Sequence, residues 1–329
     1  CVPGAVQRAG ALAGGAGDSV SCRGMGWNPI EGGFFMSYDL TFYGTGAAEG
    51  IPCPFCDCFL CRNAREKGGK EIRKRTMFRI NEEVCIDLGA DSFVASQMYG
   101  DFIHLQHALI THTHEDHFAY MMMNVRNMAY ARTSEPLHLY FTDKAFELVE
   151  FFRSQQVLLK GELQQMERDG VIQFHRLEFW QTYQIAGLEV TPLRGNHRGN
   201  MDENSALYRI KLPSGKILFY GLDTGYYYPE TFDWLREHGP VDYLISECTF
   251  GTQPGRGDHP DGHLDWNSCL HLFRQLLEQG TLHAESHIYL THINHCHNST
   301  HEDLVQMARE NADLPCPITV SYDGMQITD

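Results

Sequence analysis

The sequence is poor in positive charge and has no long apolar run. Its 329 residues include 26 lysines and arginines against 42 aspartates and glutamates, which gives a formal net charge of −16. Non-specific binding to DNA or RNA depends on cations that neutralise phosphates, so this balance disfavours a broad nucleic-acid binder. No segment approaches the roughly 18 apolar residues of a membrane-spanning helix, and no basic flank followed by an apolar core is found at the start. We therefore expect a cytoplasmic protein without a membrane partner.

The first 35 residues lack the periodicity of a helix or a strand. They are rich in Gly and Ala, and the first credible strand follows Met36. Codons for Glu31 to Met36 can contain a purine-rich ribosome-binding sequence, which favours a translation start at Met36. A native disordered tail is the alternative. We expect residues 1–35 to be a non-native or disordered leader and residues 36–329 to form one domain.

Residue patterns after Met36 predict a layered α/β architecture, because many strands come first and mixed strands and helices follow. Predicted strands span 37–43, 76–80, 83–88, 108–111, 137–141, 188–193, 206–212, 217–220 and 243–246, and predicted helices span 118–132, 144–159, 265–278 and 300–311. Residues 118–170 are expected to be a helical insertion that either packs in the core or forms a cap or homodimer surface. The Gly44-Thr45-Gly46 turn is expected to let backbone amides approach a metal or ligand.

A short apolar strand runs directly into residues 112–117, which read His-Thr-His-Glu-Asp-His. Four side chains of the metal-ligand type therefore lie on one tight turn, and they are His112, His114, Asp116 and His117. Imidazole and carboxylate groups suit borderline metals such as zinc. A solvated polar turn is a poor alternative, because nothing would relieve the crowding of these groups. The turn therefore predicts a metal site.

Three further residues follow apolar stretches, where a buried strand is expected to meet a loop: His197, Asp223 and His292. Each of them alone would more often be an ordinary capping or core residue, since loops on a rigid scaffold carry turns as well as sites. Their combination with residues 112–117 favours a larger metal cage.

The whole pattern resembles the metallo-β-lactamase superfamily, whose signature is H-x-H-x-D-H followed by a single His, a bridging Asp and a final His. The resemblance covers the chain from Ser37 onward and implies an αββα sandwich with two divalent ions, Zn or Mn. It implies that one ion is held by His112, His114 and His197 and the other by Asp116, His117 and His292, with Asp223 bridging. Two such ions about 3.5–4 Å apart turn a bridging water into hydroxide at neutral pH. Hydrolysis is therefore the expected reaction, with Asp116 essential to it.

Cysteines cluster within residues 53–61, at positions 53, 56, 58 and 61, among eleven in the chain. This spacing favours metal binding over core thiols or a disulfide framework. Together with the runs Gly44–Gly46, Thr291–His295 and Asp323–Met325, the cluster resembles the cyclic ribose phosphate phosphodiesterases of the carbon–phosphorus lyase pathway and their relatives. That family carries a structural zinc, and the resemblance implies the ligands Cys56, Cys58, Cys61 and His295 here. Cys53 departs from the family pattern, so a four-cysteine site without His295 is a second option.

Phosphodiester cleavage also needs a proton donor for the departing alkoxide, and the donor is usually a histidine. His263 stands at the start of a predicted helix, and the resemblance implies a general acid there, which Glu247 could orient. The alternative is a plain helix-start residue, with His259, His295 and His297 as nearby competitors.

The sequence thus predicts a metal-dependent phosphodiesterase that acts on a small or cyclic phosphate ester, which the ions would attract despite the acidic surface. A tRNA 3′-processing nuclease is the first alternative, but the basic, Gly/Pro-rich arm expected of it is not apparent in the sequence. A lactonase or thioesterase could use the same cage. A metal-binding scaffold without turnover is disfavoured by the complete ligand set.

Overall fold

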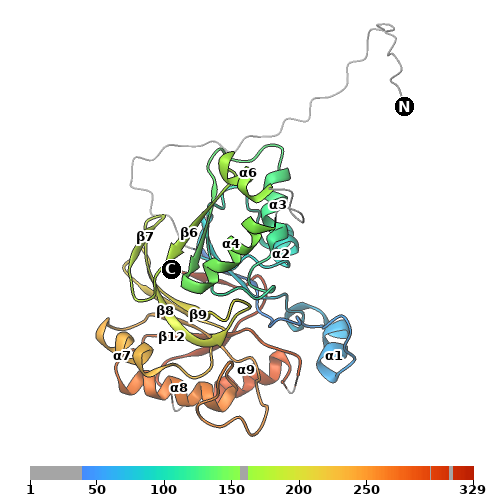
Figure 1. The fold of residues 1–329 in the computed structure, drawn as a ribbon. Coiled ribbons are helices and arrows are strands. Elements are labelled where there is room, and N and C mark those ends of the chain that lie inside the picture. The colour runs from blue at the N-terminus through green and yellow to red at the C-terminus, as the bar shows by residue number, and fades with distance from the viewer. Residues whose placement is uncertain (1–38, 156–161, 297, 311–313) are drawn as a thin grey trace, which may run out of the picture. The chain divides into compact units, whose positions relative to one another are not determined.

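Two mixed β-sheets form the centre of the protein in a computed structural model that describes residues 39–155, 162–296, 298–310 and 314–329 (Figure 1). The first sheet has the strand order β14-β1-β2-β3-β4-β5-β6, and the second has the order β13-β12-β11-β10-β9-β8-β7. Strand bounds are β1 Asp39–Gly44, β2 Met77–Arg79, β3 Val84–Ile86, β4 His107–Leu109, β5 Leu137–Thr142, β6 Ile172–Leu177, β7 Tyr183–Ile185, β8 Leu188–Arg198, β9 Asn204–Lys211, β10 Ile217–Gly221, β11 Tyr243–Glu247, β12 His287–Thr291, β13 Ile318–Val320 and β14 Gln326–Thr328. The predicted leader, residues 1–35, lies outside the described residues.

Helices cover the outer faces of the two sheets. Their bounds are α1 Phe59–Lys67, α2 Ser92–Tyr99, α3 Tyr120–Met128, α4 Phe146–Ser154, α6 Glu162–Arg168, α7 Pro229–Glu237, α8 Trp266–Glu278 and α9 His301–Glu310. Helices α2, α3, α4 and α6 lie on the side of the first sheet, whereas α7, α8 and α9 lie on the side of the second (Figure 1). No helix of the described part is long and apolar enough to cross a membrane.

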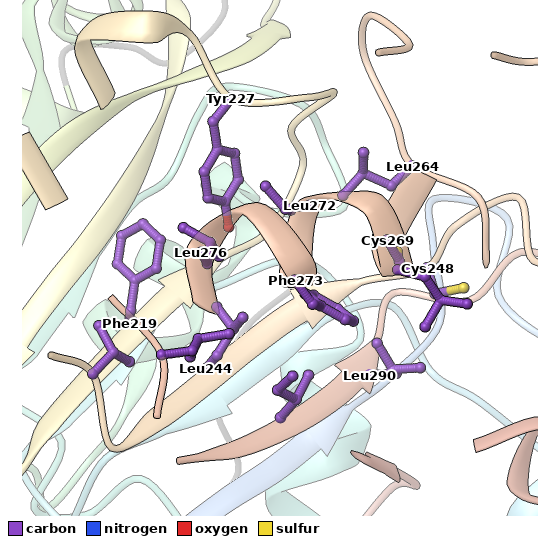
Figure 2. Close-up of a cluster of buried hydrophobic side chains, with 14 of the residues drawn as sticks. Phe219, Tyr227, Leu244, Cys248, Leu264, Cys269, Leu272, Phe273, Leu276 and Leu290 are labelled. Carbon is purple, nitrogen blue, oxygen red and sulfur yellow. The ribbon is translucent and has the colours of Figure 1, made fainter. Parts of the chain in front are cut away.

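Three apolar clusters separate these layers. One lies between the sheets and contains Phe42 and Tyr208, and another packs the first sheet against its helices through Phe141 and Met123. The third joins the second sheet to α8, and it contains Leu276 and Phe273 of the helix together with Phe219 of β10 and Leu244 of β11 (Figure 2). Burial of this apolar surface is the main favourable term that holds the layers together. The arrangement is the predicted αββα sandwich.

Local signals in the sequence account for individual elements. The antiparallel hairpin of β2 and β3 forms because the Asn81 side chain accepts hydrogen bonds from the backbone amides of Glu83 and Val84, both at 2.8 Å, which is typical of asparagine in turns. Helix α8 begins with a capping box, in which Asp265 accepts from the Ser268 amide at 3.0 Å and the Ser268 hydroxyl accepts from the Asp265 amide at 2.9 Å. Both devices satisfy amides that would otherwise lack partners.

Two expectations need correction. Residues 118–170 contain helices, but β5 lies among them and pairs with β4 and β6 in the first sheet. The segment is therefore a built-in part of the sandwich and not a helical insertion.

At the end of β1, a Cβ atom on Gly44 would lie 2.0 Å from the carbonyl oxygen of Arg75. The absent side chain thus lets two backbone segments approach each other, rather than a ligand.

Candidate metal centre

The residues of the predicted cage gather where strands of the two sheets end. The turn of residues 112–117 follows β4, Asp223 follows β10, and His292 follows β12. Strands β10, β11 and β12 are parallel neighbours, so their carboxyl ends lie at one edge of the sheet. His197 lies near the end of β8. Loops at this edge are the usual place for a site in a sheet of this kind.

Three imidazoles converge in the first half of the cage. His112 Nε2 lies 2.9 Å from His114 Nδ1, and His197 Nε2 lies 3.2 Å from the same atom. Nitrogen ligands of a tetrahedral zinc ion lie about 3.3 Å apart, given zinc–nitrogen bonds of about 2.0–2.1 Å. The three nitrogens therefore have the spacing of ligands to a single ion, and all lie within 4.8 Å of one another.

The second half of the cage mixes imidazoles and carboxylates. His117 Nε2 lies 3.1 Å from an Asp116 oxygen and 2.6 Å from Asp223 Oδ2, and His292 Nε2 lies 3.0 Å from Asp223 Oδ1. Asp223 also groups with His112 within ligand distance. The Asp223 carboxylate thus lies between the two halves, as a bridging ligand would.

Buried polar atoms without partners indicate that the cage fits a cation. Although they lie close together, His117 Nε2 and Asp223 Oδ2 are among the buried side-chain atoms of the described residues that have no hydrogen-bond partner. Leaving such atoms unpaired costs about 1–3 kcal/mol each. Burial would lower the pKa of His117, but Asp223, Asp116 and Asp87 hold it well above its ordinary value. A local field this negative attracts divalent cations.

Each imidazole of the second half is oriented by a hydrogen bond of its Nδ1 atom, which faces away from the cage. His117 Nδ1 donates to the Asp87 carboxylate at 2.6 Å. The Thr76 hydroxyl donates to the Gly46 carbonyl at 2.8 Å, so it accepts from His292 Nδ1 at 2.8 Å. Both rings therefore turn Nε2 and its lone pair toward the cage, which is how proteins prepare histidine ligands.

Asp87 and Thr76 were missed by the sequence analysis. Asp87 follows β3 and has a left-handed backbone, with φ of 65°, as do Asp223 at 47° and His292 at 56°. Non-glycine residues adopt this conformation at a cost, and they concentrate at functional sites. A polar residue directly after a buried strand was the available signal for Asp87, but nothing in the sequence links it to His117.

His263 and Glu247 form a pair at the side of the cage. Glu247 is fully buried at the end of β11 and accepts hydrogen bonds from the backbone amides of Thr224 at 2.6 Å and Leu264 at 3.0 Å. His263 Nδ1 lies 3.1 Å from Glu247 Oε2 and 3.6 Å from Asp223 Oδ1. Because a carboxylate only accepts, Nδ1 carries a proton and Nε2 is the atom left for other chemistry.

The charge of Glu247 favours the protonated form of His263. Burial lowers the pKa of His263, but the charge and hydrogen bond of Glu247 outweigh it and raise the pKa to about 9. Glu247 shows the matching change, since burial raises its pKa and His263 brings it below the ordinary value. The side chain of His263 is 21% exposed, so solvent and small molecules reach it. His263 also groups with His197 and Asp223 at ligand distance.

The cysteine cluster forms a separate group. Cys56, Cys58, Cys61 and His295 place one ligand atom each within 4.8 Å of the others. Cys58 Sγ lies 3.6 Å from His295 Nδ1. Cys53 is outside this group, and its backbone amide instead donates to Cys61 Sγ at 3.3 Å. The geometry therefore brings His295, rather than Cys53, to the fourth position.

The sequence matches the model of the β-lactamase superfamily domain over residues 85–293. The matched segment includes every residue of the predicted two-ion cage. This chain belongs to the β-lactamase superfamily. The superfamily comprises metal-dependent hydrolases, and membership implies divalent-metal binding. No curated protein matches the sequence.

Several solved structures share the fold. A diphosphatase of the PhnP family is 20% identical, with a TM-score of 0.62, over 88% of this chain and 96% of that one. Zn²⁺-bound PqqB from Methylobacterium extorquens is 17% identical, with a TM-score of 0.63, over 88% of this chain and 99% of that one. The short form of human tRNase Z is 16% identical, with a TM-score of 0.57, over 88% of this chain and 98% of that one. At these identities the similarities establish the metallo-β-lactamase fold alone.

Proposed function

We propose that this protein is a dinuclear metal-dependent phosphodiesterase that acts on a small, linear or cyclic, phosphate ester. The observation that carries the proposal is the pairing of His263 with Glu247 directly beside Asp223. A carbonyl substrate with a good leaving group does not need an acid at this position, whereas a phosphodiester with an alkoxide leaving group does. The similarity in fold to a diphosphatase of the PhnP family supports the same class of substrate.

The proposed roles divide the cage into two halves. His112, His114 and His197 would hold one ion, Asp116, His117 and His292 would hold the other, and Asp223 would contribute to both. Two divalent ions, Zn or Mn, would supply an activated water and neutralise charge on the phosphate. Asp87 and Thr76 keep the lone pairs of His117 and His292 directed at the cage.

His263 supplies the leaving-group proton in this proposal. Its Nδ1 is held by Glu247, so Nε2 is the atom that donates to the departing alkoxide oxygen. A pKa of about 9 keeps that proton in place at neutral pH. The imidazolium loses one proton, the alkoxide becomes an alcohol, and the Glu247 carboxylate orients the ring throughout.

A structural zinc at the cysteine cluster is part of the proposal. Three thiolates and one imidazole are the usual ligands of a closed tetrahedral zinc site. His295 lies three residues after His292, so the zinc would tie the loop of residues 53–61 to the turn that carries His292.

A tRNA-processing nuclease is less well supported. The described parts of residues 143–170 form α4, α6 and a short turn of helix instead of a basic Gly/Pro-rich arm. The net charge of −16 opposes a long polyanionic substrate. The similarity to human tRNase Z concerns the fold only.

An assay panel tests the proposal directly. Metal-depleted protein, reloaded with Mn or Zn, is given bis(p-nitrophenyl) phosphate, a 2′,3′-cyclic nucleotide, a cyclic ribose phosphate, a precursor tRNA, a lactone and a thioester. We expect metal-dependent turnover of the small phosphodiesters, with Asp233→Ala on the exposed face of α7 as a matched surface control. Turnover of the lactone or thioester without any phosphodiester hydrolysis would overturn the proposal.

A further inference from the structure

A cavity of about 250 Å³ lies between α3, the loop of residues 129–132 and the turn of residues 102–105. Nine of the eleven residues that line it are apolar, and the other two are Arg126 and Arg132. Its buried wall consists of four apolar side chains, Leu88, Leu105, Met122 and Leu137. An apolar cavity of about 150 Å³ is enough to hold a benzene molecule, so this one has room for a larger apolar group.

Arg126 borders the cavity with a guanidinium whose partners, among the described residues, are all neutral. Its Nε donates to the Val171 carbonyl at 3.2 Å, and its Nη2 donates to the Glu135 carbonyl at 2.6 Å and to the Thr133 hydroxyl at 3.5 Å. Its Nη1 donates to no acceptor in the described part of the chain. Because arginine stays protonated in proteins, Arg126 brings a full positive charge and a spare donor to the edge of an apolar cavity.

Arg132 adds a second positive charge to the same cavity. Its side chain is exposed, and neither Arg132 nor Arg126 forms an ion pair within the described residues. Burial and the charge of Arg132 both lower the pKa of Arg126, which means that the two guanidinium groups repel each other. A bound anion would offset this repulsion and accept from the spare donor, and carboxylates are good partners for arginine.

The lining of the cavity therefore selects for two properties in one ligand. Binding sites for small molecules are concave and mostly apolar, with a few polar groups that fix the orientation of the ligand. An uncharged apolar molecule would leave the two arginines uncompensated, and a small inorganic anion would leave the apolar wall unfilled. A molecule with an apolar tail and one anionic head satisfies both.

We propose that this cavity binds an amphipathic carboxylate, such as a fatty acid of medium chain length, with its tail against the apolar wall and its head on Arg126 and Arg132. The site is distinct from the metal cage but adjoins it through the backbone. Leu88 directly follows Asp87, and its amide donates to the His117 carbonyl at 2.7 Å. The inference goes beyond the proposed phosphodiesterase activity and does not depend on it.

Calorimetric titration of the metal-loaded protein with four matched probes tests the proposal. Octanoate has both the tail and the anionic head, octanol lacks the charge, octylamine reverses it, and acetate lacks the tail. We expect octanoate to bind at one site per chain, at least roughly tenfold more tightly than octanol. Octylamine should not bind measurably, and acetate should not displace octanoate, because a head group alone does not fill the cavity.

Two variants at the exposed rim locate the binding site. Arg132→Ala should weaken octanoate binding roughly three- to tenfold and leave octanol binding unchanged, because it removes charge but no apolar wall. Ala131→Trp places a large side chain at the rim and should abolish the binding of both probes. Arg236→Ala, which removes an exposed arginine of α7, is the matched control and should bind octanoate like the wild type. Thermal unfolding of each variant checks that the fold is retained.

Several results would overturn the inference. Equal affinities for octanoate and octanol would show that the arginines do not recognise a head group. Octanoate binding that is unchanged in both rim variants, or that acetate displaces, would place the ligand elsewhere, for instance at the metal cage. A chain that binds no octanoate would refute the proposal outright, and a dimer disrupted by Ala131→Trp would then assign this surface to a second copy of the chain.

Discussion

The two clusters of metal-binding side chains differ in how they are built. The His/Asp cage draws its residues from several strand ends of both sheets, and His112, His117 and Asp223 are at most 2% exposed. The cysteine cluster draws three of its four residues from positions 56–61, and two of these are half-buried. The sandwich therefore assembles the cage, whereas a loop has to be folded to assemble the cysteine site.

The two clusters also differ in the hydrogen-bond partners of their ligand side chains. The cage histidines have oxygen partners such as Asp87 and Thr76 on the nitrogen that faces away from the cage. Hydrogen bonds to the cluster sulfurs come from backbone amides of the same loop, for example from Cys53 to Cys61 and from Cys58 to Cys56. The cage ligands are thus oriented by residues from elsewhere in the sandwich, whereas these cysteine sulfurs are supported by amides of their own loop.

The largest expected effect is at the bridging carboxylate. Asp223→Ala removes contacts to His117 and His292, and turnover should fall by at least roughly 1,000-fold because both ions lose a ligand. Metal analysis should show loss of active-site metal with the cysteine-site zinc retained. Loss of metal from both sites together would contradict the separation of the two regions.

His263→Ala should have the next largest effect. Loss of the proton donor should lower kcat by roughly 100- to 10,000-fold for an alkoxide leaving group, with metal content unchanged. The loss should be much smaller for a p-nitrophenolate leaving group, which departs without a proton. An unchanged rate with the poor leaving group would exclude His263 as the acid.

Asp87→Asn tests whether the Asp87 carboxylate orients the His117 ring for metal binding. The substitution replaces the carboxylate that accepts from His117 Nδ1 at 2.6 Å, and we expect active-site metal affinity to fall by roughly 10- to 100-fold. Competition with a chelator measures the affinity, and Asp233→Asn on the surface is the control. An unaltered metal affinity would show that the sandwich alone holds His117 in place.

Cys58→Ala tests the cysteine cluster. It should remove the cysteine-site zinc and lower the thermal midpoint, because metal binding there contributes to folding free energy. The turnover of the folded fraction at low temperature should change only a few-fold, since the cage keeps its own partners. Loss of active-site metal in Cys58→Ala would mean that the two regions form one unit.

The smallest expected effect is a shift in pH dependence. A general acid has to hold its proton, and the pKa of His263 is raised to about 9 by Glu247 against the lowering effect of burial. Turnover should therefore fall as the pH rises through about 9. Glu247→Gln removes the charge and should move this limb to lower pH by about one unit. An alkaline limb at the same pH in the variant would contradict this role for Glu247.

The parts of the site that are contiguous in sequence could be predicted. Four ligand-type side chains within residues 112–117 are visible without any structure, and apolar runs located most strands to within a few residues. Helices α1, α2 and α7, of eight or nine residues each, were not predicted.

Contacts between distant segments could not be predicted. His117 and Asp87 are 30 positions apart, and His292 and Thr76 are 216 apart, so no local pattern connects them. The Gly44–Gly46 turn was misinterpreted because its sequence does not reveal that a backbone segment fills the space.

The most direct test of the account is a titration of metal-depleted protein with Mn²⁺ while hydrolysis of a cyclic phosphodiester is followed. The account predicts no turnover without metal and full turnover once two ions per chain occupy the cage, whether or not the cysteine-site zinc has been retained. Full turnover with one ion per chain, or in the absence of metal, would contradict it.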